Sequence, residues 1–290
     1  MASSRRGVVL GLLPLLLPYA ALFGAGLVLT LLQSLDLLTP LGGSGPTLDH
    51  YRTLPHDRSL GQSLAFTLYV ALVSAAGSVA GGTLLALALW RMPPTARRIG
   101  IVSKIGLILP HVSVAFVVLL FFSRTGLIAS LCFQLGLIDS AEAFPQLLYT
   151  GSGLGMILAY WLKGVPFALL LIGAVLFGFD TRLIQTARML GAGRMRIFVS
   201  VVLPRILPAV HSAFIILFLY ALGAFDIPFV LGESSPAMLS IRIYDLFFQQ
   251  DLAERPRVMA ILTGLFVFAA LFSALYLRFA AYLESGRRKL

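Results

Sequence analysis

The chain has 290 residues, of which 59% are apolar and 12% are charged, and its formal net charge is +10. Its mean hydropathy of +0.94 exceeds that of a water-soluble domain, so the composition excludes an ordinary soluble domain and indicates a protein of the lipid bilayer. The Arg and Lys residues form short clusters between long apolar runs instead of a stripe interleaved with aromatic residues, which argues against nucleic acid as a partner.

Six apolar stretches follow one another along the chain, and each reaches the ~20 residues that a helix needs to cross a bilayer core. They lie near residues 8–32, 62–90, 101–122, 153–179, 205–230 and 257–281. The first stretch, preceded by Arg5 and Arg6, also resembles a signal peptide, but it is about twice as long as the apolar region of such a peptide, so we expect a membrane span. The predicted fold class is an all-α integral membrane protein with six transmembrane helices.

The charges of the connecting segments alternate along the chain. Basic residues gather before the first span, between the second and third, between the fourth and fifth, and after the last; they are Arg5, Arg6, Arg91, Arg97, Arg98, Lys104, Arg182, Arg188, Arg194, Arg196, Arg205, Arg287, Arg288 and Lys289. Segments 33–61, 123–152 and 231–256 are acidic on balance. The positive-inside rule therefore places both termini in the cytoplasm. We expect two parts, residues 1–60 with the first span and an external loop, and residues 61–290 as the core.

Segment 180–204 is too long and too patterned for a simple connector. Asp180 or Thr181 suits the start of a helix, and two glycines, Gly191 and Gly193, suit its end and a sharp turn. The apolar residues between them share one face, namely Leu183, Ala187 and Leu190. Pro204 suits the start of the next span. The segment therefore predicts a helix–turn–helix at the cytoplasmic surface, ready to dock into a partner.

The same segment resembles the cytoplasmic loop E-A-A-x3-G-x9-I-x-L-P of permeases of binding-protein-dependent ABC importers. The chain has Gln185-Thr186-Ala187, then Gly191 after three residues, and Val201-Val202-Leu203-Pro204 after nine more. The spacing matches throughout, whereas Gln185 and Thr186 replace the usual Glu and Ala. Further segments resemble the spermidine/putrescine-like branch, which includes polyamine, ferric-ion, thiamine and phosphonate importers; they are Thr67 to Gly82, Ser123 to Leu127, Pro166-Phe167 and Leu222 to Gly232. The resemblance covers most of residues 60–285.

This resemblance implies a type I importer permease of the bacterial cytoplasmic (inner) membrane. Segment 181–200 would be the coupling helix seated in a groove of an ATPase subunit, with the coupling residues Gln185, Ala187, Arg188, Leu190, Gly191, Ala192, Leu203 and Pro204. The implied partners are two ATPase subunits, a second permease that is homologous and not identical, and an external or periplasmic substrate-binding protein docked on the three acidic segments. The implied substrate is a polyamine or a related small charged solute, and the motifs leave its identity open.

The chain shows no catalytic or cofactor motif. None of its three lysines, Lys104, Lys163 and Lys289, ends a G-x4-G-K-S/T phosphate loop, so we expect partner subunits to use the ATP and this chain to bind no cofactor. No nucleophile–base set is apparent, and we predict that the chain is not an enzyme. Cys132 is alone and no two histidines have ligand spacing, which argues against a metal site.

Three polar residues within the spans are candidates for a translocation path. Lys163 lies near the middle of span four, where a charge costs ~2.5–3.5 kcal/mol, and it either lines a path or pairs with a neighbouring helix. Asp226, near the outer end of span five, either lines a cavity or breaks the helix before Pro228. Tyr220 either lines the path or faces lipid. For His111 and His211 a packing role is expected.

Two other functions remain open on the sequence. A gradient-driven secondary transporter or channel component would move solute without a bound ATPase, and a membrane scaffold would move none. Neither requires the spacing of segment 180–204, so an ABC importer permease is the preferred interpretation.

Overall fold

The structure is a computed structural model that describes residues 5–38, 45–93, 95, 100, 105–248 and 251–287, with the backbone alone described for 5–10 and 283–287. Several of the predicted cytoplasmic basic residues, Arg97, Arg98, Lys104, Arg288 and Lys289, lie outside the described residues. The described part forms helices and no strands, and six helical segments are long and apolar enough to cross a membrane. The predicted all-α fold with six spans is confirmed.

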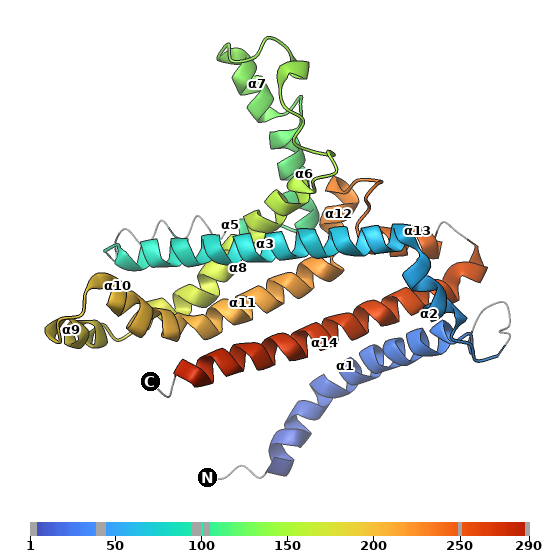
Figure 1. Cartoon of the computed structure of the whole chain (residues 1–290), viewed down its shortest axis with the longest axis horizontal. Coiled ribbons are helices and arrows are strands. Elements are labelled where there is room, and N and C mark those ends of the chain that lie inside the picture. Colours follow the sequence, from blue (N-terminus) through green and yellow to red (C-terminus); the bar gives the residue numbers. More distant parts are fainter. Residues whose placement is uncertain are drawn as a thin grey trace. The chain divides into compact units, whose positions relative to one another are not determined.

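Figure 1 shows the long helices. They are α1 (Arg5–Ser34), α3 (Arg58–Arg91), α6 (His111–Phe122) with α7 (Leu127–Gln134), α8 (Leu154–Phe177), α11 (Leu203–Gly223) and α14 (Arg255–Arg287). Four of the six predicted stretches each form one of them, α1, α3, α8 and α14. The shorter helices include α2 (Asp49–Thr53), α5 (Ile105–Ile108), α9 (Arg182–Met189), α10 (Arg194–Ile197), α12 (Asp226–Leu231) and α13 (Leu239–Phe248). Segment 33–61, expected to be an external loop, contains α2.

Two of the predicted spans are interrupted by proline. The third begins at His111 instead of near residue 101, because Pro110 lacks the N–H that a continuous helix needs and separates α5 from α6. The fifth ends at Gly223 instead of residue 230: Pro228 cannot donate to the carbonyl of Ala224, four residues earlier, and Ala224 is extended. The chain resumes as the short helix α12.

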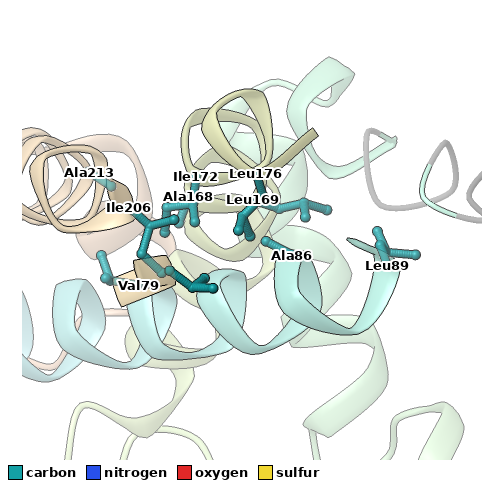
Figure 2. Packing of buried hydrophobic residues seen from close by; sticks show 10 residues of the cluster. Val79, Ala86, Leu89, Ala168, Leu169, Ile172, Leu176, Ile206 and Ala213 are labelled. Carbon is teal, nitrogen blue, oxygen red and sulfur yellow. The ribbon is translucent and has the colours of Figure 1, made fainter. Parts of the chain in front are cut away.

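The chain divides into two compact units, Met1–Gly61 with Arg242–Ala270, and Gln62–Ile241 with Leu271–Leu290. The second unit contains the predicted path residues and the predicted coupling segment. Its core joins α3, α8 and α11, whose buried side chains point toward one another (Figure 2). The residues of this core include Val79, Ala86, Leu89, Ala168, Leu169, Ile172, Leu176, Ile206 and Ala213. Small residues at these contacts let the helices approach closely, as in other membrane helix bundles.

In the first unit, Asp57 is the centre of a charge network at the start of α3. One carboxylate oxygen accepts hydrogen bonds from the backbone N–H groups of Ser59 at 2.9 Å and Leu60 at 3.1 Å, which caps the helix. The other oxygen lies 2.7 Å from the guanidinium of Arg257 and 3.8 Å from that of Arg242. Burial would raise the pKa of Asp57, but the bonds from Leu60 and Ser59 and the charge of Arg242 outweigh it and hold this pKa below its ordinary value.

We expect Asp57→Asn to destabilise the protein at neutral pH by about 2 kcal/mol, because the partly covered guanidinium of Arg242 loses its counter-charge and that of Arg257 keeps only Glu254, at 3.3 Å. Because the folded-state pKa is lowered, the ionised carboxylate stabilises the protein above the unfolded pKa of about 3.9, and this stabilisation is lost as the pH falls through the folded value. The unfolding temperatures of wild type and Asp57→Asn should therefore differ most at pH 7, and the difference should shrink as the pH falls below about 3.9.

Asp49→Asn is the matched control for this measurement. The Asp49–Arg52 pair is 3.4 Å long, and its side chains are 73% and 77% exposed. An ion pair in water contributes little, so the unfolding temperature should hardly change. An equal effect of both substitutions would contradict the role of the Asp57 network.

Candidate functional site

The first part of the candidate site is the predicted cytoplasmic helix, which forms as α9. The carboxylate of Asp180 accepts a hydrogen bond from the N–H of Arg182 at 2.9 Å and so caps the start of the helix; Thr181 makes no such bond. At the other end Gly191 has φ +80°, a left-handed conformation suited to glycine. The N–H of Gly191 donates to the carbonyl of Arg188 at 2.9 Å, and that of Ala192 to the carbonyl of Ala187 at 3.0 Å. These two bonds form a Schellman motif.

After this turn the chain runs as one continuous helix into the fifth span. Gly193 has φ −69°, so Gly191 alone supplies the left-handed turn. The helix α10 continues through a π-helical segment, Phe198–Val202, into α11, which has Pro204 in its first turn, as predicted. The uninterrupted helical segment is Arg194–Gly223. Leu203 packs against the core of the second unit, so Leu203 and Pro204 anchor the segment and do not belong to its exposed surface.

The turn carries apolar side chains that the described residues leave uncovered. Met189 is 81% exposed, Leu190 is 82% exposed and Met195 is 75% exposed. Of the predicted apolar face, Leu183 and Leu190 are exposed and Ala187 is half-buried. An apolar cluster that its own chain does not cover marks a surface for another molecule. We call Met189, Leu190 and Met195 the exposed apolar cluster.

A hollow of about 610 Å³ lies beside α9. Gln185 and Arg188 of α9 line it, together with Arg91 and Trp90 at the end of α3 and Arg194 of α10. In the part of the chain that is described, none of the three arginines forms an ion pair. Two predicted coupling residues thus line a basic hollow, while Leu190 belongs to the exposed apolar cluster.

The second part of the candidate site is a cavity of about 310 Å³ within the second unit. Its polar lining comes from four helices, and the remaining lining is apolar. The polar residues are Ser74 and Ser78 of α3, His111 of α6, Tyr160 and Lys163 of α8, and Tyr220 of α11. Two of the predicted path residues, Lys163 and Tyr220, therefore meet at one cavity. Asp226 is not among its lining residues and is exposed in the first turn of α12.

Lys163 is hydrogen-bonded to the break at Pro110. The ammonium donates a hydrogen bond to the carbonyl of Leu109 at 2.6 Å, a group at the gap between α5 and α6. Non-helical backbone inside a membrane is tolerated where such a partner satisfies it. Lys163 thus bonds to backbone at the gap between α5 and α6 and also lines the cavity.

Sequence reasoning missed the hydroxyls of Ser74, Ser78 and Tyr160 in this cavity, and it missed that His111 lines the cavity. The ring of His111 lies 4.9 Å from that of Tyr220 beside the cavity, whereas His211 accepts or donates a 2.7 Å hydrogen bond with the hydroxyl of Tyr276. A signal for the hydroxyls existed in span two, where four buried polar residues recur at helical spacing: Ser63, Thr67, Ser74 and Ser78. Such small polar residues in a span commonly face other helices or a cavity.

At the predicted outer side of the second unit, segment 123–152 is joined to the end of α12. The hydroxyl of Tyr149 donates to the carbonyl of Val230 at 2.7 Å, and the N–H of Gly151 donates to the carboxylate of Glu233. Two of the three segments predicted to dock an external protein are thus fixed to each other.

The comparisons with known proteins agree with this geometry. A family model described as "Binding-protein-dependent transport system inner membrane component" matches residues 77–289. The chain belongs to this family. The matched residues include the whole of segment 180–204.

Two curated relatives carry transport names. The inner membrane ABC transporter permease protein YnjC of Escherichia coli K12 is 28% identical over 215 residues, which are 73% of this chain and 39% of YnjC. The molybdenum transport system permease protein ModB of the same strain is 29% identical over 130 residues, which are 45% of this chain and 53% of ModB. The family member therefore spans only about two fifths to one half of the relatives that it matches.

Solved structures share the fold. A chain of the crystal structure of a bacterial ABC transporter involved in the import of the acidic polysaccharide alginate superposes with a TM-score of 0.74, at 19% identity, over 96% of this chain and 94% of that chain. A chain of the inward-facing MetNI methionine ABC transporter gives a TM-score of 0.52, at 16% identity, over 83% and 99%. The predicted importer transmembrane fold is confirmed by these likenesses.

Proposed function

We propose that this family member is a permease subunit of an ATP-driven importer and couples to ATPase subunits through segment 181–200. The observation that carries the proposal is the exposed apolar cluster, held on α9 and α10 by the Schellman turn at Gly191. A turn rigidly built at the end of a short helix, with its apolar side chains uncovered, suits insertion into a groove of a partner protein. The position of this turn in the family pattern supports an ATPase as that partner.

The assembly we propose has two ATPase subunits, a second permease that is homologous and not identical, and an external substrate-binding protein. A related alginate transporter has been crystallised in complex with an alginate-bound periplasmic protein, which supports such a partner here. The link between Tyr149–Gly151 and Val230–Glu233 supports part of the docking face. ATP would be hydrolysed by the partner subunits, and both termini of the permease would be cytoplasmic in the inner membrane.

We propose alternating access as the mechanism, in which closure of the ATPase subunits moves α9 and α10 and thereby α11. Lys163 and Tyr220 would then line the path, and Asp226 would lie beside it. The solute would be small and charged. The sequence resemblance favours polyamines, whereas relatives named for molybdenum and for sulfate transport favour an inorganic anion.

The test is affinity purification of the tagged protein from its own cells in mild detergent, with bound proteins identified by mass spectrometry. We expect a phosphate-loop ATPase and a second permease in the eluate. Leu190→Glu, which places a charge in the exposed apolar cluster, should release the ATPase and retain the second permease. Recovery of the chain without an ATPase in several detergents would instead favour the gradient-driven transporter or channel component.

A further inference from the structure

The cavity beside Lys163 contains buried hydroxyls that the protein itself leaves without partners. Tyr160 is 5% exposed and Ser74 is 2% exposed, and both line the cavity. Among the described residues, neither the Tyr160 hydroxyl nor the Ser74 hydroxyl has a hydrogen-bond partner. Buried hydroxyls are almost always hydrogen-bonded, so two that meet at one cavity indicate that a ligand or water satisfies them.

The charge of Lys163 decides which kind of ligand fits. An ammonium has three N–H donors, and the bond to the Leu109 carbonyl uses one of them. The described lining contains no carboxylate, and Lys163 forms no ion pair in the part of the chain that is described. Asp226 is close enough to act electrostatically on His111, Tyr160 and Tyr220, but it is exposed and outside the lining. The cavity therefore has a positive charge without a countercharge on its wall.

Hydroxyl groups suit either sign of ligand, because they donate as well as accept. The ammonium of Lys163 suits only an anion, since a second cation brought beside it in a low-dielectric cavity is repelled. An anion gains both the charge of Lys163 and the donors of Tyr160 and Ser74. Charge-assisted hydrogen bonds of this kind are the strong ones.

We propose that this cavity binds an oxyanion group of the transported solute, with Lys163 as the countercharge and Tyr160 and Ser74 as hydrogen-bond donors. The inference rests on the proposed permease function and names the substrate class of its path. Inorganic oxyanions and carboxylates of organic solutes share this chemistry. A polyamine lacks this chemistry, so the inference opposes a polyamine as the transported solute.

The test is equilibrium binding of radiolabelled sulfate to the purified complex of permease and ATPase subunits in neutral-lipid nanodiscs, without the external binding protein. We expect sulfate to bind the wild type, and putrescine at equal ionic strength not to compete. Molybdate and succinate serve as competitors that distinguish inorganic oxyanions from organic carboxylates. Displacement of sulfate by molybdate alone indicates that the cavity binds inorganic oxyanions, and displacement by succinate as well indicates that it also binds organic carboxylates.

Three variants locate the binding in the cavity. Lys163→Met should weaken sulfate binding about tenfold to a hundredfold, and Tyr160→Phe about tenfold, because each loses a hydrogen bond to an anion. Tyr69→Phe, the matched control for Tyr160→Phe at an exposed tyrosine of α3 outside the lining, should bind sulfate as the wild type does. The ATPase should co-purify with every variant, which shows that folding and the permease assembly are intact.

Three results would overturn the inference: no oxyanion binding by the wild-type complex, sulfate binding that is unchanged in Lys163→Met, or putrescine binding that Lys163→Met strengthens. Each of these leaves the proposed permease function standing, provided that the ATPase still co-purifies. Loss of the ATPase from the wild-type complex would instead refute the permease function on which the inference rests.

Discussion

Replacement of Gly191 by valine is expected to abolish solute-driven ATP hydrolysis while membrane insertion remains intact. Gly191 has φ +80°, a left-handed conformation that is strongly disfavoured for a β-branched residue. Its N–H donates to the carbonyl of Arg188, and this bond and the bond from Ala192 to Ala187 form the Schellman motif. A strain of about 1–2 kcal/mol shifts the equilibrium of the turn away from its docked conformation roughly fivefold to thirtyfold. The measurement is solute-stimulated ATPase activity in proteoliposomes that contain the complete importer.

Gly193 provides the control for this substitution. Neither Gly191 nor Gly193 has a heavy atom within 4 Å of an added Cβ, so a small side chain meets no clash at either position. Only Gly191 has the left-handed backbone, since Gly193 has φ −69°. Gly193→Ala should therefore retain activity, and Gly191→Asn, which tolerates that backbone, should retain more than Gly191→Val. Undiminished ATPase stimulation in Gly191→Val would disprove the docking role of this turn.

The second large effect is expected at Gly82, where α3 crosses α8. A Cβ on Gly82 would lie 2.5 Å from the Cβ of Ala168, 2.8 Å from the N of Leu169 and 2.9 Å from the carbonyl oxygen of Val165. Two of these atoms belong to the backbone of α8, so no side-chain rotation relieves the clash. Gly82→Ala should cost about 2 kcal/mol and lower the unfolding temperature by roughly 5 °C in a thermal melt of the purified protein.

Gly61, near the start of the same helix, provides the control. An added Cβ there meets nothing within 4 Å, and alanine is the better helix former. Gly61→Ala should leave the unfolding temperature unchanged or raise it slightly. A tolerated Gly82→Ala would mean that the α3–α8 contact is looser than its geometry indicates.

The spans and the cytoplasmic turn were predictable from sequence because each depends on local chemistry. Apolar length determines a span, and the pair formed by an Asp180 cap and a Gly191 stop determines α9, whatever the rest of the chain does. The breaks in spans three and five were also readable in principle. Pro110 and Pro228 mark positions where a break was possible, although Pro166 and Pro208 lie inside the unbroken helices α8 and α11.

The cavity could not be predicted, because it depends on which helices meet. Lys163 is recognisable as costly in any sequence, but its acceptor, the Leu109 carbonyl, is 54 residues away. Ser74 and Tyr160 are unremarkable on their own and become informative only when two helices place both hydroxyls beside the same space without partners. The oligomeric partners and the solute depend on contacts beyond this chain, which its local patterns do not encode.

The π-helical segment Phe198–Val202 joins α10 and α11 into a single continuous helix. At about 1.5 Å per residue, the helix from Arg194 to Gly223 is ~45 Å long, and no extended residue interrupts it. One end carries Met195 of the exposed apolar cluster, and the other part carries Ile216 and Tyr220 of the cavity wall. A displacement of the cytoplasmic end is therefore carried along one continuous helix to the wall of the cavity.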